Sequence, residues 1–595
     1  MSSAISRLKR FVQLEQTEEM EKTKGMAWTN KDLAPNPPET RRWNAWSFFL
    51  FQFSISFSPT TYNAGASLVS LGLLWWHIFL AAWVGSALCC VLVLLNARGP
   101  SRYHIGFPSF VRISAGLRGS LFWVFIRGVV AILYMATQTL YAGYLMDVCL
   151  RCVFGYKWMN IPNTLPASAG TTSRKLLAFF ILCKRNPVLV GIRILVLIAF
   201  SAGFIQFPFM FIHPSKTSKV FAAKSFIVVP SLFATMGWAI AASGGSAHLD
   251  KLVVTTVTGS QLGWGFMQAL NSTISNVLPP LVNIADLARY AQNPRQTWTI
   301  TYGLFISKPI VILMGMVIAS CGKHLYGTTY WNLWDFFNAV LDNNWNAGAR
   351  TLVFLACLTQ VYATFVTNIS SNSIPVGCDL AGLFPRYFSI VRGQVLCAIL
   401  AICVVPWKLV ASAAQFVTFL GSYICFICPI LAIEIVDYWF VRRGNVHIPS
   451  VFSPGPKSVY WYWHGFNLRA YAAWIIGVVL VVHGVANALH PGSLGVASTR
   501  LYNMGFIVST LAGGVSYYII CRFFPPQIMP DTHPEEPTTW EHLAPTEGYF
   551  PDDDDIPDYI LFCGDDVQAR TPLSDTEARE KNMKLGEGSL NVVEV

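Results

Sequence analysis

The amino-acid sequence predicts an all-α polytopic membrane protein with about twelve transmembrane helices. Of its 595 residues, 53% are hydrophobic and only 12% are charged, whereas soluble domains carry about 25% charged residues. Apolar runs recur between residues 44 and 524, and a run of about 20 residues can cross a bilayer core of about 30 Å. The predicted spans are 47–70, 73–96, 120–148, 176–213, 221–243, 263–285, 299–320, 351–375, 393–411, 413–440, 469–490 and 502–524.

The distribution of Lys and Arg over the short loops predicts the orientation, because basic residues accumulate on the cytoplasmic side. We expect a plasma-membrane protein with both termini in the cytoplasm. Lys323 and Arg350 are exceptions on the external side, and no signal peptide is expected. The residues assigned to the inside are Arg41, Arg42, Arg98, Arg102, Arg112, Lys216, Lys219, Lys224, Arg289, Arg295, Arg386, Arg392, Arg442 and Arg443.

Two segments outside the spans differ from the transmembrane domain 44–524. Residues 1–43 form a predicted cytoplasmic N-terminal segment. Residues 525–595 hold 17 of the 31 acids and four of the 42 bases, which predicts a disordered acidic tail. Lys581 and Lys584 in this tail are candidate ubiquitin acceptors, so we expect partners from the trafficking machinery. The net-basic remainder suits an anionic inner leaflet, and nucleic acid is not expected as a partner.

Two spans contain residues that interrupt helices. The first has SISFSPTTYNAGAS (54–67), with Pro59, and the sixth has NSTISNVLPPLVN (271–283), with Pro279 and Pro280. The first and sixth spans are five apart, as two inverted halves of five spans each would require. Transporters bind solutes near the bilayer midplane where helices are broken. We therefore assign helix-break or gating roles to Pro59, Pro279, Pro280 and Tyr423.

Polar side chains recur at helical spacing in two further spans. Tyr134 and Gln138 share a helix face in the third, and Asn368 and Asn372 share one in the eighth. An aromatic ring can stack on a flat solute, and an amide can both donate to it and accept from it. The alternative is hydrogen bonding between helices. Arg127, two turns before Tyr134, fits an interfacial arginine whose charge reaches the headgroups.

Catalysis and metal binding have no support in the sequence. No histidine stands in a motif with a serine or cysteine nucleophile. The fourteen cysteines lack metal-ligand spacing, and those within spans suit buried free thiols. We therefore expect neither an enzyme nor a bound metal or cofactor.

Six stretches show that the chain resembles fungal members of the nucleobase–cation symporter 1 family, which includes uracil, allantoin, uridine and thiamine permeases. These stretches follow the family's order and cover nearly the whole membrane region. They are WTNKDLAPNPPETRRWNAWSFF (28–49), FPSFVRISAGLRG (107–119), TNISSNSIPVGCDLAGLFPRYFSIVRGQ (367–394), VVPWKLV (404–410), VDYWFVRRG (436–444) and GFNLRAYAAW (465–474).

The resemblance implies a fold and a site. The fold is the LeuT-like five-plus-five inverted repeat followed by two C-terminal helices. The substrate site falls on Tyr134, Gln138, Val277 and Asn372, with Thr367 and Asn368 supporting the helix or the cation region. The implied function is import of a small heterocyclic nutrient by cation-coupled alternating access. The alternative is a sensor of the same fold that binds a nutrient without transporting it.

The site departs from the family's pattern at four positions. Tyr134 stands where Trp is usual, and Val277 replaces an aromatic residue. Ile55 and Leu262 occupy places where uracil and allantoin permeases carry an acid and a lysine. The first-span SISFSPTTY is nearer to the thiamine-permease-like branch. A substrate other than uracil or allantoin is compatible with these differences.

The coupling ion also follows from the resemblance. In the sodium-coupled bacterial relative, two adjacent hydroxyl residues on the eighth span help to bind the ion. The corresponding pair here is Val366-Thr367, which lacks one hydroxyl. Since hard cations need several oxygen ligands, we expect coupling to H⁺ rather than Na⁺.

The fourth span contains an atypical insertion, 183–203. Family members run directly from a segment like LLAFFIL (176–182) to one like FIQFPFMFIHP (204–214). The insertion makes the region nearly twice as long as a bilayer requires. Our interpretation is a translated intron; an external loop and an extra span are the alternatives.

Overall fold

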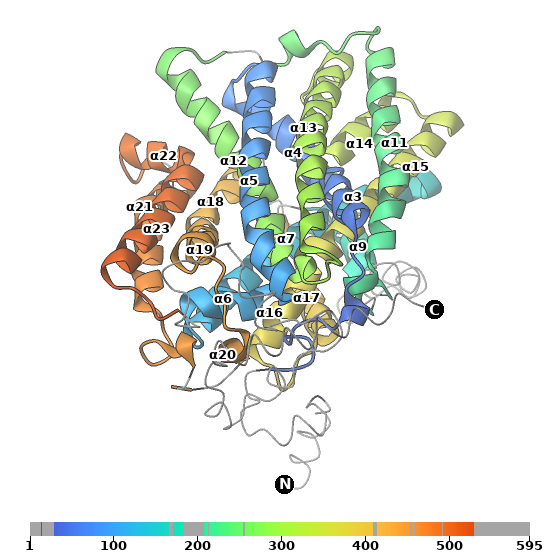
Figure 1. The fold of residues 1–595 in the computed structure, drawn as a ribbon. Helices are drawn as coiled ribbons and strands as arrows, with labels where there is room; N and C mark the ends of the chain where they lie inside the picture. Colours follow the sequence, from blue (N-terminus) through green and yellow to red (C-terminus); the bar gives the residue numbers. More distant parts are fainter. Residues whose placement is uncertain are drawn as a thin grey trace, which may run out of the picture.

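A computed structural model describes residues 14, 29–165, 171–183, 208–211, 214–253, 256–408, 413–452, 455–456, 458–490 and 492–528. These residues form a bundle of helices (Figure 1), and no β-strand occurs among them. The insertion 183–203, except for Cys183, and the acidic tail from Met529 onward lie outside this part of the chain. Their predicted roles are therefore not addressed by the structure.

The first predicted span is interrupted, as its sequence predicts. It consists of α3 (Ala45–Ser56) and α4 (Pro59–Ser67), separated by Phe57 and Ser58. Asn44 caps the start of α3 by accepting a hydrogen bond from the backbone N–H of Ser47 at 2.9 Å. Pro59 is the first residue of α4, a position where the missing N–H has no intrahelical partner. The predicted break at Pro59 is confirmed.

The predicted break at Pro279 and Pro280 is wrong. Helix α12 (Gly259–Ala288) runs through both prolines without interruption. Each proline lacks the N–H that would bond to the carbonyl four residues earlier. The carbonyl of Ser275, which Pro279 leaves free, accepts a hydrogen bond from the hydroxyl of Tyr423 instead. A side chain thus satisfies a backbone group that the proline pair leaves unpaired, so the helix continues.

Eight of the twelve predicted spans correspond, within the described residues, to helices or joined helices that are long and apolar enough to cross a membrane. The other four differ for separate reasons. The first is broken, the fourth lies partly outside the described residues, α12 is rich in polar residues, and α17 (Ile390–Cys403) is short. The eight are Trp75–Tyr103, Gly119–Phe154, Ser218–Ala242, Pro294–Tyr326, Ala347–Leu383, Gln415–Val441, Leu468–Leu489 and Gly505–Phe523.

The broken first span packs mainly against α13, and its first half also packs against α11 (Figure 1). Helices α21 and α23 pack against each other at one side, whereas α6 and α16 lie at the end opposite α14. The remaining bounds are α5 (Trp75–Tyr103), α6 (Phe107–Ala115), α7 (Gly119–Phe154), α8 (Tyr156–Met159), α9 (Ser173–Cys183), α11 (Ser218–Ala242), α13 (Thr299–Tyr326), α14 (Leu333–Asn343), α15 (Ala347–Asn368), the π-helical turn η10 (Ile369–Ser373), α16 (Ile374–Leu383), α18 (Ala413–Ser422), α19 (Ile424–Val436), α20 (Ile448–Phe452), α21 (Leu468–Leu489), α22 (Val496–Asn503) and α23 (Gly505–Phe523).

Two glycines allow α4 and α13 to pack backbone to backbone. A Cβ atom on Gly65 would collide with the backbone of Ile312, and one on Gly315 would collide with the carbonyl of Tyr62. Only glycine leaves room for this approach. Lys308 lies two turns before Gly315 on the same face of α13. The close packing therefore brings Lys308 to the break in the first span.

Candidate functional site

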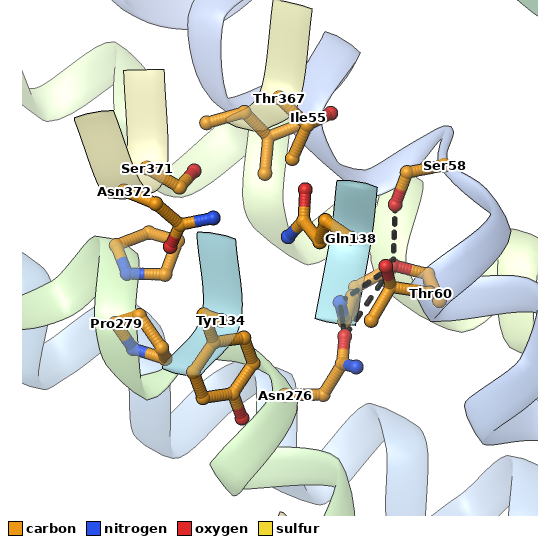
Figure 2. A pocket seen from close by; sticks show the side chains of 13 residues that line it. Ile55, Ser58, Thr60, Tyr134, Gln138, Asn276, Pro279, Thr367, Ser371 and Asn372 are labelled. Atoms are coloured by element: carbon orange, nitrogen blue, oxygen red, sulfur yellow. Dashed lines mark hydrogen bonds between the residues drawn. The ribbon is translucent and has the colours of Figure 1, made fainter. Parts of the chain in front are cut away.

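A small cavity lined mainly by polar residues lies at the break between α3 and α4. Thirteen residues from the first span, α7, α12, α13 and the α15–η10 segment line it (Figure 2). The cavity volume open to the centre of a water molecule is only about 20 Å³. A bulkier solute can therefore enter only when the surrounding helices move apart. The lining residues are Ile55, Ser58, Thr60, Thr61, Tyr134, Gln138, Asn276, Pro279, Pro280, Lys308, Thr367, Ser371 and Asn372.

Two amide side chains predicted from the sequence meet in this cavity. Gln138 on α7 and Asn372 on η10 point toward one another in Figure 2. The Oε1 atom of Gln138 and the Oδ1 atom of Asn372 are buried and accept no hydrogen bond from any residue that the structure describes. Unpaired buried carbonyl oxygens are costly. Both are therefore suited to accept hydrogen bonds from a bound molecule.

Asn368 orients Asn372. The Nδ2 atom of Asn372 donates to Oδ1 of Asn368 at 2.7 Å. Asn368 in turn donates from its own Nδ2 to Oγ1 of Thr139 at 2.9 Å and to the carbonyl of Met135 at 3.3 Å. This chain of amides fixes the Asn372 side chain with its oxygen unpaired. Asn368 does not line the cavity, which agrees with the supporting role implied by the resemblance.

Tyr134 lies in the cavity wall and is covered by Tyr423. The Tyr134 hydroxyl donates to the Tyr423 hydroxyl at 3.0 Å, and the two rings meet edge to face with centroids 5.3 Å apart. Tyr423 also holds the Ser275 carbonyl on α12. Movement of the segment that carries Tyr423 would change contacts with both α7 and α12. Its assignment as a gating residue remains a prediction.

Val277, which the resemblance places at the substrate site, does not line this cavity. The residues of α12 that line the cavity are Asn276, Pro279 and Pro280, which follow the i, i+3, i+4 pattern of one helix face. Val277 is rotated by about 100° from Asn276 on the same helix and packs in the hydrophobic core. Asn276 lies three and four residues before Pro279 and Pro280, so helical spacing places it on the same face as the two prolines.

Lys308 is a cavity residue that the sequence interpretation missed. Its side chain is 3% exposed. Its Nζ atom donates to Oγ1 of Thr61 at 2.9 Å and also to Oδ1 of Asn276. Lys308 therefore links α13 to α4 and α12 at the break. A lone lysine within an apolar span was the available signal.

Lys224 was counted among the charges on the cytoplasmic side, although it falls within the predicted span 221–243. The residue lies within α11 and has no exposed surface (0%). Its Nζ atom donates to Oγ1 of Thr367 at 2.5 Å, and the Thr367 hydroxyl donates to the carbonyl of Ala363 at 2.9 Å. The hydroxyl predicted to support a cation is thus already bonded to an ammonium group.

Arg127 is not an interfacial arginine. It is 3% exposed, lies 2.8 Å from Asp286 on α12 and forms a two-pronged ion pair with Asp379 on α16. Its guanidinium lies over the ring of Phe107, 3.8 Å from the centroid. The backbone N–H of Phe107 donates to Asp286 at 3.0 Å. This buried charge cluster joins α6, α7, α12 and α16. Its two carboxylates hold the Arg127 guanidinium inside the bundle, so the side chain does not reach the headgroups.

Comparison with known proteins agrees with this architecture. Residues 35–509 match the family described as permeases for cytosine/purines, uracil, thiamine and allantoin. An allantoin permease of Saccharomyces cerevisiae is 30% identical over 504 residues, covering 83% of this chain and 76% of the relative. A uracil permease of the same yeast is 29% identical over 502 residues, with the same two coverages of 83% and 76%.

Solved structures of similar fold include Mhp1, a nucleobase-cation-symport-1 family transporter. Its closed form with bromovinylhydantoin bound gives a TM-score of 0.63 at 17% identity, covering 85% of this chain and 99% of Mhp1. Its inward-facing form gives 0.62 at 16% identity, covering 86% and 97%. The likeness confirms the predicted LeuT-like five-plus-five fold.

A bundle of this fold, with a small cavity of polar residues at a broken first span, is that of a secondary active transporter. The chain belongs to the nucleobase–cation symporter 1 family, the permeases whose description its residues 35–509 match. The alternative of a non-transporting sensor is not favoured, because the curated relatives above are permeases.

Proposed function

We propose that this protein imports a small planar heterocycle across the plasma membrane by cation-coupled alternating access. The observation that carries the proposal is the pair of unpaired amide oxygens, on Gln138 and Asn372, that line one small cavity. Ring N–H groups of a cyclic amide would donate to these oxygens. Allantoin and uracil, named for the two yeast relatives, both carry such groups.

The cavity favours a ring of modest size and leaves the identity of the substrate to experiment. Tyr134 supplies an aromatic wall, and α12 offers Asn276 and two prolines. The test is uptake of radiolabelled uracil, allantoin, uridine, thiamine and nicotinamide riboside in a permease-deficient yeast. Saturable accumulation of at least one of these heterocycles, or of a carboxylated analogue of one, is expected. Binding without accumulation across a broad heterocycle panel would contradict a transport function.

Lys224 supports coupling to protons. Its ammonium group occupies the position against Thr367 where a coupling cation would need oxygen ligands. A sodium ion there would meet a like charge, whereas a lysine can itself release and regain a proton. We expect uptake to continue without external sodium and to fall to background when a protonophore is added.

Lys224→Gln is expected to remove proton-driven accumulation while substrate exchange across the membrane persists. The amide keeps a donor for Thr367 but cannot titrate. Lys219→Gln is the matched control, since Lys219 lies five residues earlier on α11 with an exposed side chain. Accumulation by Lys224→Gln that still collapses with a protonophore, or sodium-dependent uptake by the wild type, would contradict this mechanism.

We place both termini in the cytoplasm and assign the acidic tail to trafficking and turnover. Truncation from Met529 onward is expected to leave the substrate KM unchanged and to alter the amount of protein at the cell surface. The truncation keeps Gln527, whose carbonyl accepts from Arg442 at 3.3 Å. Lys581→Arg and Lys584→Arg together test ubiquitin attachment. A changed KM at normal surface abundance would contradict a purely trafficking role.

A further inference from the structure

Two buried lysines meet at the cavity without a carboxylate. Lys308 lines it, and Lys224 bonds to Thr367, which also lines it. No Asp or Glu occurs in the sequences of α3, α4, α5, α11, α13, α15 or η10. The helices around the break thus supply positive charge and no negative charge.

The acids on the other lining helices are already paired elsewhere. Asp286 on α12 lies 2.8 Å from Arg127. Asp147 on α7 accepts from Nε1 of Trp158 at 2.8 Å and lies 3.0 Å from Arg174. Neither forms an ion pair with Lys308 or Lys224 among the described residues. A buried ammonium group normally has an anionic partner, so the cavity lacks one charge that its occupant can supply.

Lys308 has a donor to spare for such an occupant. An ammonium group has three N–H donors, and the two hydrogen-bond partners of Lys308 among the described residues, Thr61 and Asn276, are both neutral. Both partners line the cavity together with Lys308. An anion that contacts Nζ would add the charge that these neutral oxygens do not provide.

The start of α4 adds positive potential at the same place. The aligned backbone dipoles of a helix attract anions to its N-terminus. At this helix start the dipole is the main contribution, because Pro59 has no N–H and the N–H groups of Thr61 and Tyr62 donate to the Ser58 carbonyl. Ser58 is the N-cap residue of this nine-residue helix, and its side chain makes no capping hydrogen bond. The Oγ1 atom of Thr60 is buried in the cavity without a hydrogen-bond partner in the described residues. The start of α4 and the unpaired Thr60 hydroxyl therefore both favour an anion close to Lys308.

We infer that the transported heterocycle carries a carboxylate, which pairs with Lys308 at the N-terminus of α4 while ring N–H groups face Gln138 and Asn372. This inference rests on the proposed function and narrows the substrate class to heterocyclic acids. Lys308 then determines specificity between acids and their neutral counterparts.

Matched pairs of solutes test the inference on the full-length protein. Orotate is uracil with a carboxylate, and dihydroorotate is dihydrouracil with a carboxylate; all four rings carry N–H groups. Binding of each to the purified transporter is measured by thermal stabilisation, and uptake is measured with the radiolabelled compounds. We expect at least one acid to bind about tenfold more tightly than its neutral counterpart, as charge-assisted hydrogen bonding predicts.

Three variants test whether a preference for the acid over its neutral counterpart depends on Lys308. Lys308→Gln is expected to remove the preference for the acid, and Lys308→Arg to retain it. Lys323→Gln is the control on the same helix, because Lys323 donates to the carbonyls of Lys251 and Leu252 at 2.9 and 3.0 Å and does not line the cavity.

The possible outcomes distinguish a failure of this inference from a failure of the proposed transport function. Equal or tighter binding of the neutral members by the wild type overturns the inference even if Lys308→Gln does not fold, and leaves the transporter assignment standing. If Lys308→Gln weakens binding of the acid and of its neutral counterpart equally, the inference is also overturned. Lys308 would then hold the helices together without distinguishing the acid from the neutral solute. Failure of every heterocycle, acidic or neutral, to accumulate contradicts the proposed function itself.

Discussion

Arg127→Gln is expected to lower the free energy of unfolding by about 3–5 kcal/mol and to abolish uptake. Removing one partner of a buried ion pair leaves the other charge uncompensated, which is the costly case. Here two buried carboxylates, on Asp286 and Asp379, depend on the same guanidinium. The substitution would therefore separate α7 from α12 and α16 at this end of the bundle. Thermal unfolding in detergent and the amount of protein at the cell surface measure the effect.

Neutralising the two carboxylates should restore part of the stability that Arg127→Gln removes. In the triple variant with Asp286→Asn and Asp379→Asn, no unpaired charge remains buried in the cluster. Its melting temperature is expected to lie between those of Arg127→Gln and the wild type. Arg118→Gln serves as the control, because Arg118 precedes the same helix with an exposed side chain. A melting temperature of Arg127→Gln equal to that of the wild type would show that the ion pairs add no stability.

Local sequence patterns predicted the parts of the structure that depend on local chemistry. Apolar length predicted eight of the spans, and Pro59 predicted the break in the first because a proline at position N1 suits a helix start. The same rule failed at Pro279 and Pro280. There the deciding partner is Tyr423, 148 residues away along the chain from the Ser275 carbonyl that it satisfies. No local pattern reveals such a contact.

The two lysines show how a compositional rule can conceal a functional residue. Lys224 was counted as a loop charge because it stands close to Lys216 and Lys219, although the helix that buries it begins at Ser218. Lys308 was passed over within an apolar run. The partner of Lys224 is 143 residues distant and one partner of Lys308 is 247 residues distant. The cost of a charge inside a span is visible in sequence, but its partner is visible only in the fold.

The residues of the candidate site also fall into those that the sequence predicted and those that it did not. Spacing of four residues placed Tyr134 and Gln138 on one face of α7, and the family resemblance added Asn372; all three line the cavity. On α12 the same resemblance led to Val277, one residue from the lining position Asn276. A shift of one residue turns a helical side chain by about 100°. Helix register must therefore be known to the residue before a cavity can be assigned.

Gln138→Ala and Asn372→Ala are each expected to abolish saturable uptake while the protein remains at the cell surface. Each removes one oxygen that a substrate N–H would use in a cavity with little room for water. A hydrogen-bond donor left unpaired on the substrate costs about 1–3 kcal/mol, or roughly 5- to 150-fold in affinity. Neither oxygen has a protein partner among the described residues, so the fold should lose less than the substrate does. Radiolabelled uptake, with surface abundance measured in parallel, reports both quantities.

Two further amides separate contact with the substrate from support of the helix. Gln394 on α17 is fully buried, its amide atoms lack hydrogen-bond partners in the described structure, and it does not line the cavity. Gln394→Ala should therefore leave uptake intact. Asn368→Ala frees the Asn372 side chain to rotate, so it should raise KM less than Asn372→Ala does. If Gln138→Ala or Asn372→Ala transports with unchanged KM, the two amides only join helices, and the substrate must bind elsewhere in the bundle.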